Sequence, residues 1–265
     1  MSSPSPASGP HLETVDAGVA RVSWAPELHE QDLWAAVDVV RSAVEEALAA
    51  HGRVEAHVSA EDAAAQRVAT WSGLRREGVR RGVAGDRIVY ARLETDLPAS
   101  EPEGFRALLN SYLPRKRAIS QLLVRDTAGR VLLCELTYKR DWDLPGGVVE
   151  VGESPQRAAG REVLEELGLD LATGPLLLTD WLPPWSGWDD ALCLVFDGGS
   201  HDAAILDRVV KEAREIRSAE FCTPEQVAQR CADFTARRIA SALANLDAPP
   251  GGCDRPRPSY VESGH

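Results

Sequence analysis

The sequence predicts an α/β protein with two domains. The chain has 265 residues, and 44% of them are hydrophobic, which is enough for one large or two medium-sized cores. Its apolar residues change repeatedly between the spacing of strands and that of amphipathic helices. A stretch rich in Pro, Ser and Glu interrupts this pattern at 97–104. We expect a linker there, between domains at 12–96 and 105–246.

Both ends of the chain have the composition of disordered segments. Residues 1–11 are rich in Ser and Pro, and 247–265 contains Pro-Pro-Gly-Gly followed by Arg-Pro-Arg-Pro. Such segments bury too little apolar surface to offset the entropy that ordering would cost. We therefore expect both ends to be disordered.

The first domain is predicted to follow the order β-α-β-α-β. Apolar residues recur at helical spacing in two stretches, and alternating or β-branched runs flank them. A turn at Gly85-Asp86 precedes the core of the last strand. The predicted strands are 19–24, 53–58 and 82–93, and the predicted helices are 28–50 and 61–71.

The second domain is predicted to place strands on both sides of a central helix at 155–167. Ser154 and Pro155 supply an N-cap and a favoured first helical residue, and Gly168 suits the left-handed position that ends a helix. The other predicted elements are a short amphipathic helix at 105–112, strands at 118–125, 130–136, 176–181 and 191–196, and a last helix at 224–246.

Charge and cysteine content exclude several classes of partner. The net charge of −12 disfavours nucleic acid and membrane surfaces, since both are polyanionic. The five cysteines are odd in number and form no C-x-x-C pair, so neither a disulfide framework nor a zinc site is expected. The chain starts without a signal-peptide pattern, and no stretch approaches about 18 apolar residues. We expect a soluble cytoplasmic protein whose phosphate-bearing substrate would need a cation or a local basic patch.

One segment carries the strongest chemical signal. Residues 147–169 follow the pattern G-x5-E-x7-R-E-V-x-E-E-x-G-L. Helical spacing places Glu162, Glu165 and Glu166 on one face. Like charges about 4 Å apart repel by about 4 kcal/mol at an effective dielectric constant of 20, so the cluster must be solvated or neutralised. A solvated helix face is the simpler interpretation of three glutamates alone, but the surrounding pattern favours a divalent cation, and oxygen ligands favour Mg²⁺ or Mn²⁺.

This pattern resembles the signature of the Nudix hydrolase family at each of its fixed positions. The resemblance implies an α/β/α sandwich with a mixed sheet and a hydrolase that cleaves a phosphoanhydride bond. It also implies metal ligands and a general base, Glu162. The implied ligands are the Gly146 carbonyl and the carboxylates of Glu162, Glu165 and Glu166.

Two further residues of the pattern complete the implied catalytic set. Arg161 can pair with Glu153 or with a ligand glutamate and so hold its orientation. Many members of the family use another carboxylate outside the signature. The candidates here are Glu212, Glu215 and Glu220, which stand before the last helix, and the sequence leaves the choice among them open.

The substrate contacts are expected from basic and aromatic residues near the predicted strands. Arg117 and Lys139 could meet phosphate oxygens, although exposed strand ends often carry such charges. Trp181, Trp185 and Trp188 surround a Pro-Pro pair, where they could stack on a base or pack the loop against the core.

The first domain resembles the C-terminal half of GNAT-type N-acetyltransferases over about 18–94. The resemblance is carried by 54–58, 64–68 and 73–78. That family binds a pyrophosphate through a glycine-containing loop, but 26–33 has no glycine and carries three acidic residues. We expect a partial, non-catalytic domain that serves structure, homodimerisation or the shaping of the hydrolase site.

Three functions follow from these features. The first is a Mg²⁺- or Mn²⁺-dependent hydrolase of a nucleoside diphosphate linked to another moiety. The alternative is a catalytically inactive Nudix-type ligand-binding or sensor module, and the third is an acetyltransferase with an accessory domain. The intact glutamate set favours the first function, while the substrate itself stays open.

Overall fold

The computed structural model describes residues 9–185, 187–247 and 258–264. The chain divides into two compact units, Met1–Pro114 and Arg115–His265. Disorder was expected at both ends of the chain, and most of those residues (1–8, 248–257 and 265) lie outside the described ones. Among those that are described, no helix combines the length and apolar character needed to cross a membrane.

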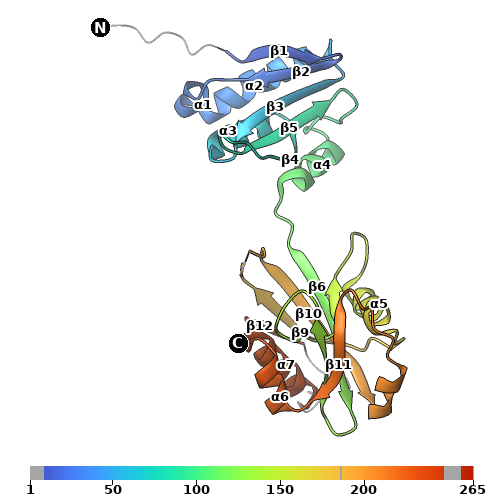
Figure 1. Cartoon of the computed structure of the whole chain (residues 1–265). Helices are drawn as coiled ribbons and strands as arrows, with labels where there is room; N and C mark the ends of the chain where they lie inside the picture. The colour runs from blue at the N-terminus through green and yellow to red at the C-terminus, as the bar shows by residue number, and fades with distance from the viewer. Residues whose placement is uncertain (1–8, 186, 248–257, 265) are drawn as a thin grey trace. The chain divides into compact units, whose positions relative to one another are not determined.

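The first unit contains a five-stranded sheet in the order β1-β2-β3-β5-β4 (Figure 1). One face packs against two helices through a core that includes Val37, Val40 and Val54. The elements are β1 (His11–Asp16), β2 (Val19–Ser23), α1 (Glu27–Gln31), α2 (Leu33–Leu48), β3 (Arg53–Ser59), α3 (Ala63–Trp71), β4 (Arg75–Arg80), β5 (Arg87–Leu93) and α4 (Pro102–Tyr112).

The first unit differs from its predicted order in two strands and one helix. β1 is almost wholly exposed, and β4 is a charged edge strand, so neither carries the apolar alternation that predicts a strand. The predicted helix at 28–50 divides at Asp32, because its carboxylate caps α2 by accepting hydrogen bonds from the N–H groups of Trp34 and Ala35.

The boundary between the units also differs from the sequence prediction. Helix α4, expected to start the second domain, packs on β4 of the first unit. Its Ser111 Oγ accepts a hydrogen bond from the Arg76 N–H at 3.1 Å. A Cβ on Gly104 would lie 2.1 Å from the Pro98 carbonyl oxygen, so the stretch expected to be a linker is closely packed there. The unit therefore extends to Pro114.

Within the described residues, the second unit has a seven-stranded mixed sheet in the order β11-β7-β6-β10-β9-β12, with β8 paired to β6. Strand β6 runs parallel to β10, and β9 runs parallel to β12. The strands are β6 (Arg117–Asp126), β7 (Val131–Leu136), β8 (Gly146–Val148), β9 (Leu176–Leu182), β10 (Ala191–His201), β11 (Ile216–Cys222) and β12 (Ser259–Glu262).

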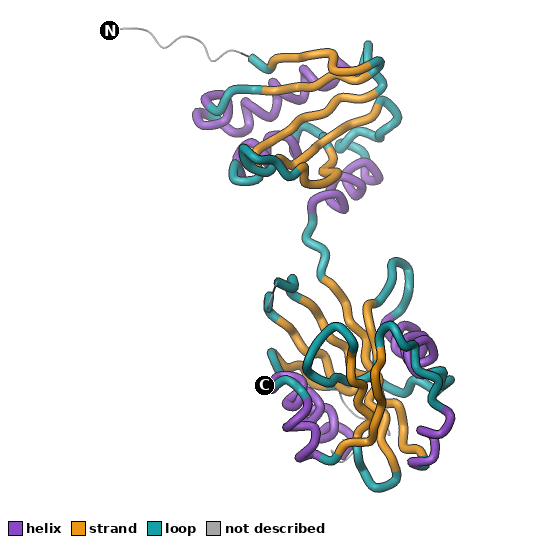
Figure 2. The backbone as a smooth tube through the Cα atoms, viewed as in Figure 1, coloured by secondary structure: helices purple, strands orange, loops and turns teal. Residues whose placement is uncertain are grey.

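Helices cover both faces of this sheet, as Figures 1 and 2 show. Successive residues of β6 point to opposite faces. Leu122 belongs to the core under α5 (Pro155–Leu167), and Leu123 belongs to the core under α7 (Asp233–Asp247). The remaining helices are α6 (Pro224–Arg230) and the short η1 (Ala203–Arg208). The α/β/α arrangement with a mixed sheet expected for this domain is present.

Two features of the second unit depart from the sequence prediction. The last helix breaks at Cys231, where the Trp142 N–H donates to the Arg230 carbonyl and separates α6 from α7. Part of the tail expected to be disordered forms β12, which extends the sheet at β9. Backbone hydrogen bonds and contacts such as Gly264 N–H to Asp180 Oδ1, at 3.1 Å, order this segment despite its low apolar content.

Four of the five cysteines lie in the described chain. Cys134, Cys193, Cys222 and Cys231 are free and buried. Burial raises the pKa of the Cys193 thiol to about 11, which keeps it protonated at neutral pH. The fifth, Cys253, lies outside the described residues.

Candidate active site

Helix α5 carries the acidic residues, and its ends lie where the sequence predicts them. Ser154 Oγ accepts a hydrogen bond from the Arg157 N–H, and Gly168 ends the helix at a φ of 67°. Val163 and Leu167 are fully buried on the sheet side. Packing of this apolar face fixes which way the glutamates of the helix project.

Glu166 is a nearly buried acid at the centre of the site. Its side chain accepts a hydrogen bond of 3.0 Å from the Gly146 N–H. The pKa of Glu166 is raised to about 8, chiefly by burial; the Gly146 N–H acts to lower it, and the neighbouring carboxylates of Glu162, Glu215 and Asp143 act to raise it. No Lys, Arg or His of the described chain forms an ion pair with it.

Glu162 lies against the glycine pair that precedes the helix. A Cβ on Gly147 would lie 2.5 Å from the Glu162 carboxyl carbon, and one on Gly146 would lie 2.2 Å from the Ser120 carbonyl oxygen. Only glycines therefore allow the loop to pass between α5 and β6 at this distance. Burial raises the pKa of Glu162, while the Arg161 charge acts to lower it.

Arg161 connects three glutamates to the loop. Its Nε and Nη2 donate to the two oxygens of Glu153 at 2.9 and 3.0 Å. Its Nη2 also donates to Glu162 Oε1 at 3.0 Å, and its Nη1 donates to Glu165 Oε2 at 2.8 Å. A further bond of 3.2 Å reaches the Val148 carbonyl. The two pairings considered from the sequence, with Glu153 or with a ligand glutamate, thus occur together.

The three candidate carboxylates outside the signature have different surroundings. Glu215 is close enough to raise the pKa of both Glu162 and Glu166. Glu220 pairs with Arg230 at 2.7 Å, and the Glu212 carboxylate accepts from the Arg214 N–H at 3.1 Å. Of these three, Glu215 is therefore the one whose charge acts on the site.

The donor set suits a hard divalent cation. The described part of the chain contains no group of three or more His, Cys, Asp or Glu side chains that is already arranged to hold a metal ion. Arg161 holds the Glu162 and Glu165 side chains, but Glu166 is buried beside other carboxylates, and no cationic partner for it occurs in the part of the chain that the structure describes. Carboxylate oxygens in such surroundings favour a cation of the Mg²⁺ class.

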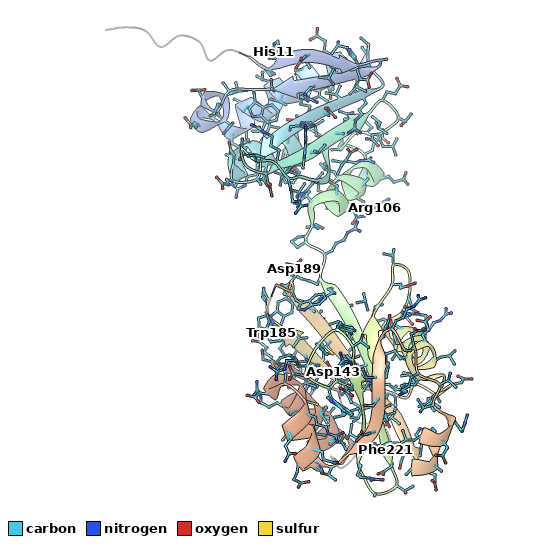
Figure 3. All side chains as sticks on the ribbon, in the orientation of Figure 1. His11, Arg106, Asp143, Trp185, Asp189 and Phe221 are labelled. Atoms are coloured by element: carbon cyan, nitrogen blue, oxygen red, sulfur yellow. The ribbon has the colours of Figure 1, made fainter. Side chains whose placement is uncertain are left out.

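A cavity of about 270 Å³ adjoins this carboxylate cluster. Gly146 and Gly147 belong to its lining. Its walls include Trp142, Trp185 and Trp188. Figure 3 places Asp143 and Trp185, which are far apart in the sequence, in this same unit. The cavity thus joins aromatic side chains to the glycine pair that lies against Glu162.

Four of the five predicted substrate contacts line this cavity, namely Arg117, Lys139, Trp185 and Trp188. The Arg117 guanidinium lies 4.8 Å from the centre of the Trp188 ring. Lys139 Nζ pairs with Asp143 Oδ2 at 2.7 Å. The fifth predicted contact, Trp181, lies on β9 under the Lys116 ammonium and is absent from the cavity lining.

The floor of the cavity contains polar residues that the sequence analysis did not single out. Arg238 is 2% exposed and donates from Nε to Asp180 Oδ2 at 2.7 Å and from Nη1 to Gln121 Oε1 at 3.1 Å. Gln121 Nε2 in turn donates to Asp143 Oδ1 at 2.9 Å. Asp180 follows an apolar run, and such an acid in a buried strand is the one available signal for this network.

Comparisons with known proteins agree with this arrangement. The NUDIX domain model matches residues 114–243. A MutT-like protein of Streptomyces ambofaciens is 30% identical over 134 residues, which cover 48% of this chain and 75% of that protein. A nucleoside triphosphatase NudI of Escherichia coli is 31% identical over 128 residues, covering 43% and 86% of the two chains.

Solved structures of this class are also similar to the chain. The crystal structure of a MutT protein from Methanosarcina mazei is 22% identical, with a TM-score of 0.44, and the match covers 52% of this chain and all of that one. The family match begins at residue 114, where the first unit ends. The chain belongs to the Nudix family and is a Nudix pyrophosphohydrolase.

Proposed function

We propose that this enzyme requires Mg²⁺ or Mn²⁺ and hydrolyses the phosphoanhydride bond of a nucleoside diphosphate linked to another moiety. The observation that carries the proposal is Glu166, a buried acid beside other carboxylates that has no ion-pair partner among the described residues. Because the aromatic cavity reaches Gly146 and Gly147, a diphosphate can lie beside this acid while its base occupies the cavity.

The residues that would hold the cation are the glutamates of α5 and the Gly146 carbonyl. The set is Glu162, Glu165, Glu166 and Gly146, with Glu215 as the added carboxylate. When bound, the cation lowers the pKa of a water molecule and neutralises charge on the diphosphate oxygens. The same charge would restore the ionised form of Glu166 at neutral pH, since an adjacent cation lowers the pKa of an acid.

Glu162 is the proposed general base. Its side chain is only 15% exposed, and burial raises its pKa. A carboxylate with a raised pKa accepts a proton more readily than an ordinary one, which suits a general base. Arg161 fixes one of its oxygens, and Gly147 leaves room for its carboxyl group. Glu162 would take the proton of the attacking water, which yields a nucleoside monophosphate and the phosphorylated remainder.

The cavity would bind the nucleoside part of the substrate. Trp185 and Trp188 are each 57% exposed, so the ring surface that their neighbours leave uncovered is available for stacking on a base. Arg117 and Lys139 lie on the cavity wall, where their charges would offset the repulsion between the glutamates and the substrate phosphates. This arrangement supports a nucleotide substrate.

A nucleoside triphosphate is the second candidate substrate. The relative named nucleoside triphosphatase NudI, at 31% identity, favours it. The bond cleaved would be the same in kind, so the glutamate chemistry would be unchanged. A relative named as a nucleoside triphosphatase also favours an active hydrolase over an inactive sensor module.

The first unit is proposed to serve structure, homodimerisation or the shaping of the hydrolase site.

Turnover of a substrate panel tests the proposal. The full chain would be incubated with nucleoside triphosphates, nucleotide sugars and dinucleotides of the ADP-ribose type, with Mg²⁺, with Mn²⁺ or with excess EDTA. We expect release of a nucleoside monophosphate from at least one diphosphate derivative, only when metal is present. Release from triphosphates alone would select the second candidate, and equal turnover in EDTA would overturn the metal requirement.

A further inference from the structure

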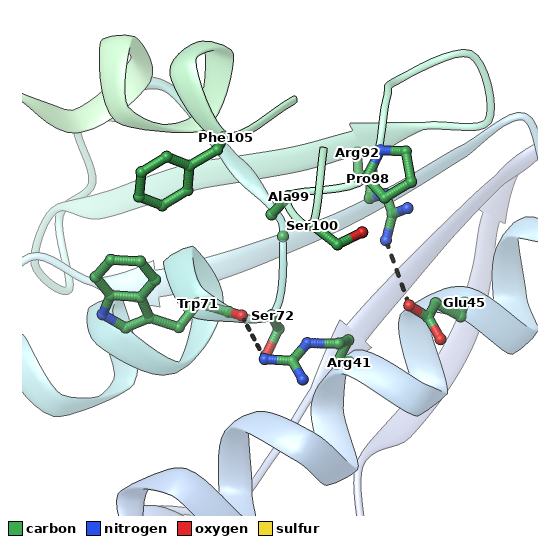
Figure 4. Close-up of a pocket in the computed structure, with 10 residues that line it drawn as sticks. Arg41, Glu45, Trp71, Ser72, Arg92, Pro98, Ala99, Ser100 and Phe105 are labelled. Atoms are coloured by element: carbon green, nitrogen blue, oxygen red, sulfur yellow. Dashed lines mark hydrogen bonds and ion pairs between the residues drawn. The ribbon is translucent and has the colours of Figure 1, made fainter. Parts of the chain in front are cut away.

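The first unit contains a cavity of about 470 Å³ that the hydrolase site does not use (Figure 4). It lies between the second half of α2, the end of α3, β5 and the segment that enters α4. All of its lining belongs to the first unit, and its size falls within the range of about 300–1,000 Å³ typical of small-molecule sites. The residues that matter here are Arg41, Trp71, Gly73, Arg92, Ala99 and Phe105.

Two arginines give the cavity a cationic end. The Arg92 side chain is only 12% exposed, and its one ion-pair partner among the described residues, Glu45, is 4.0 Å away and 58% exposed. No side-chain hydrogen bond of Arg92 occurs in that part of the chain. Arg41 donates from Nη2 to the Trp71 carbonyl at 3.0 Å, which holds its guanidinium at the same cavity, and it pairs through Nη1 with Asp38 at 3.0 Å, so Arg92 is the less fully paired of the two. A poorly paired, largely buried guanidinium favours an anion.

Aromatic rings form another part of the wall. Figure 4 shows Trp71 and Phe105 on one side of the cavity, away from Arg92. Trp71 packs edge-on against Tyr112, with ring centres 6.2 Å apart, and lies 6.4 Å from Trp34. These neighbours fix the Trp71 ring, and Phe105, which is 40% exposed, offers a second apolar surface for a planar ligand.

A glycine keeps the cavity open beside the cationic end. Gly73 has a φ of 92°, a backbone conformation that residues other than glycine rarely adopt. A Cβ there would lie 3.5 Å from Arg92 Nη1. Any other residue would therefore have a strained backbone, and its side chain would contact the Arg92 guanidinium. One cavity is thus lined by Gly73, by the two arginines and by the aromatic side chains.

We propose that this cavity binds a small anion that carries an aromatic ring. The phosphate or carboxylate would lie between Arg92 and Arg41, and the ring would lie against Trp71 and Phe105. A nucleoside monophosphate has this chemistry, and so does an aromatic carboxylate. The site is independent of the hydrolase reaction, because none of its residues belongs to the second unit.

Calorimetric titration of the full chain in EDTA tests this proposal. The probes are AMP, UMP, 4-hydroxybenzoate and inorganic phosphate. We expect one of the ring-bearing anions to bind at one site with a Kd below about 1 mM, in the range usual for small-molecule sites. Stronger binding of a nucleotide or of the benzoate identifies the source of the anion. No binding of any ring-bearing probe, or equal binding of inorganic phosphate, would overturn the proposal.

Variants locate the binding site. Arg92→Gln should weaken binding by about tenfold or more, since it removes a charge-assisted contact. Ala99→Phe fills the cavity from its loop and should also weaken binding, without altering either arginine. The matched control, Arg81→Gln, changes an exposed arginine of the same unit and should have no effect. Loss of binding on Arg117→Gln, with Arg92→Gln unaffected, would place the ligand in the hydrolase cavity and contradict the assignment.

Discussion

The Gly146 N–H donates a 3.0 Å hydrogen bond to Oε2 of Glu166, and this contact joins the glycine loop to helix α5. The two residues are 20 positions apart, yet the bond places the loop carbonyl and the buried acid in one small region. A single neutral N–H stabilises a buried carboxylate only partly, which is why the pKa of Glu166 stays raised, at about 8.

The first prediction concerns the stability of the metal-free protein as the pH changes. The pKa of Glu166 is about 8 in the folded protein, well above its ordinary value of 4.5, so folding favours the protonated acid. Its contribution is fully present below pH 4.5 and is lost as the pH rises through 8. Thermal unfolding in EDTA should therefore show wild type losing more stability than Glu166→Gln between pH 6 and 8.5.

Added Mg²⁺ should reverse this loss, because a bound cation favours the ionised acid. The rise in Tm on adding Mg²⁺ should be larger at pH 8 than at pH 6 in wild type, and Glu166→Gln should not show the difference. An equal rise at both pH values in wild type would argue against Glu166 as a metal ligand.

The second prediction is that Gly147→Ala displaces Glu162, the proposed general base. The new methyl group would lie 2.5 Å from the Glu162 carboxyl carbon, so that carboxylate must move. A displacement of about 1 Å can lower a rate by about 100-fold, and we expect a loss of kcat of that order. Gly52→Ala is the matched control, because a Cβ there meets no atom within 4 Å. Unchanged kcat in Gly147→Ala would contradict the proposed position of Glu162.

The third prediction concerns Arg161 as a positioning residue. Arg161→Met removes the bonds to Glu153, Glu162 and Glu165 and should lower kcat by about 10- to 100-fold, the usual cost of losing such a support. Arg161→Lys should recover little of the lost activity, because an ammonium group cannot reproduce the bidentate hydrogen bonds to Glu153.

A pH profile separates this role from a merely structural one. Arg161 lowers the pKa of Glu162, so its removal should move the acidic limb of the kcat profile to higher pH. A loss of activity with no movement of that limb would indicate that Arg161 acts only on folding.

The fourth prediction concerns the buried pair under the cavity. Arg238→Met leaves Asp180 fully buried without its partner and should destabilise the protein by about 3–5 kcal/mol, measured by urea unfolding. Adding Asp180→Asn should restore part of this loss, because no uncompensated charge remains. A single variant destabilised by less than about 1 kcal/mol would show that the pair contributes little.

Local signals explain which parts of the fold the sequence could predict. Helix α5 was predicted at both ends because Ser154, Pro155 and Gly168 act within a few residues of where they stand. Strands β1 and β4 lack apolar alternation, so no pattern in the sequence indicates them. The amphipathic pattern of α4 predicts a buried face, but not which domain covers it.

The same distinction applies to the site. The glutamates and Arg161 lie in one short segment, where helical spacing brings them together. The floor of the cavity combines Gln121, Asp143 and Arg238 from three elements that are distant in the sequence. Such contacts arise only when the whole domain packs, so single residues in these positions carry little local signal.

The most direct test of the central claim is the kcat of Glu166→Gln with Mg²⁺ on the best substrate of the panel, measured beside wild type. Gln keeps the size of the side chain and can accept from the Gly146 N–H, but it cannot carry a negative charge. We expect a loss of about 100-fold or more with the fold intact by circular dichroism, the scale typical of a lost electrostatic contact at a reacting centre. Wild-type turnover in this variant would contradict a metal-dependent mechanism that relies on the α5 glutamates.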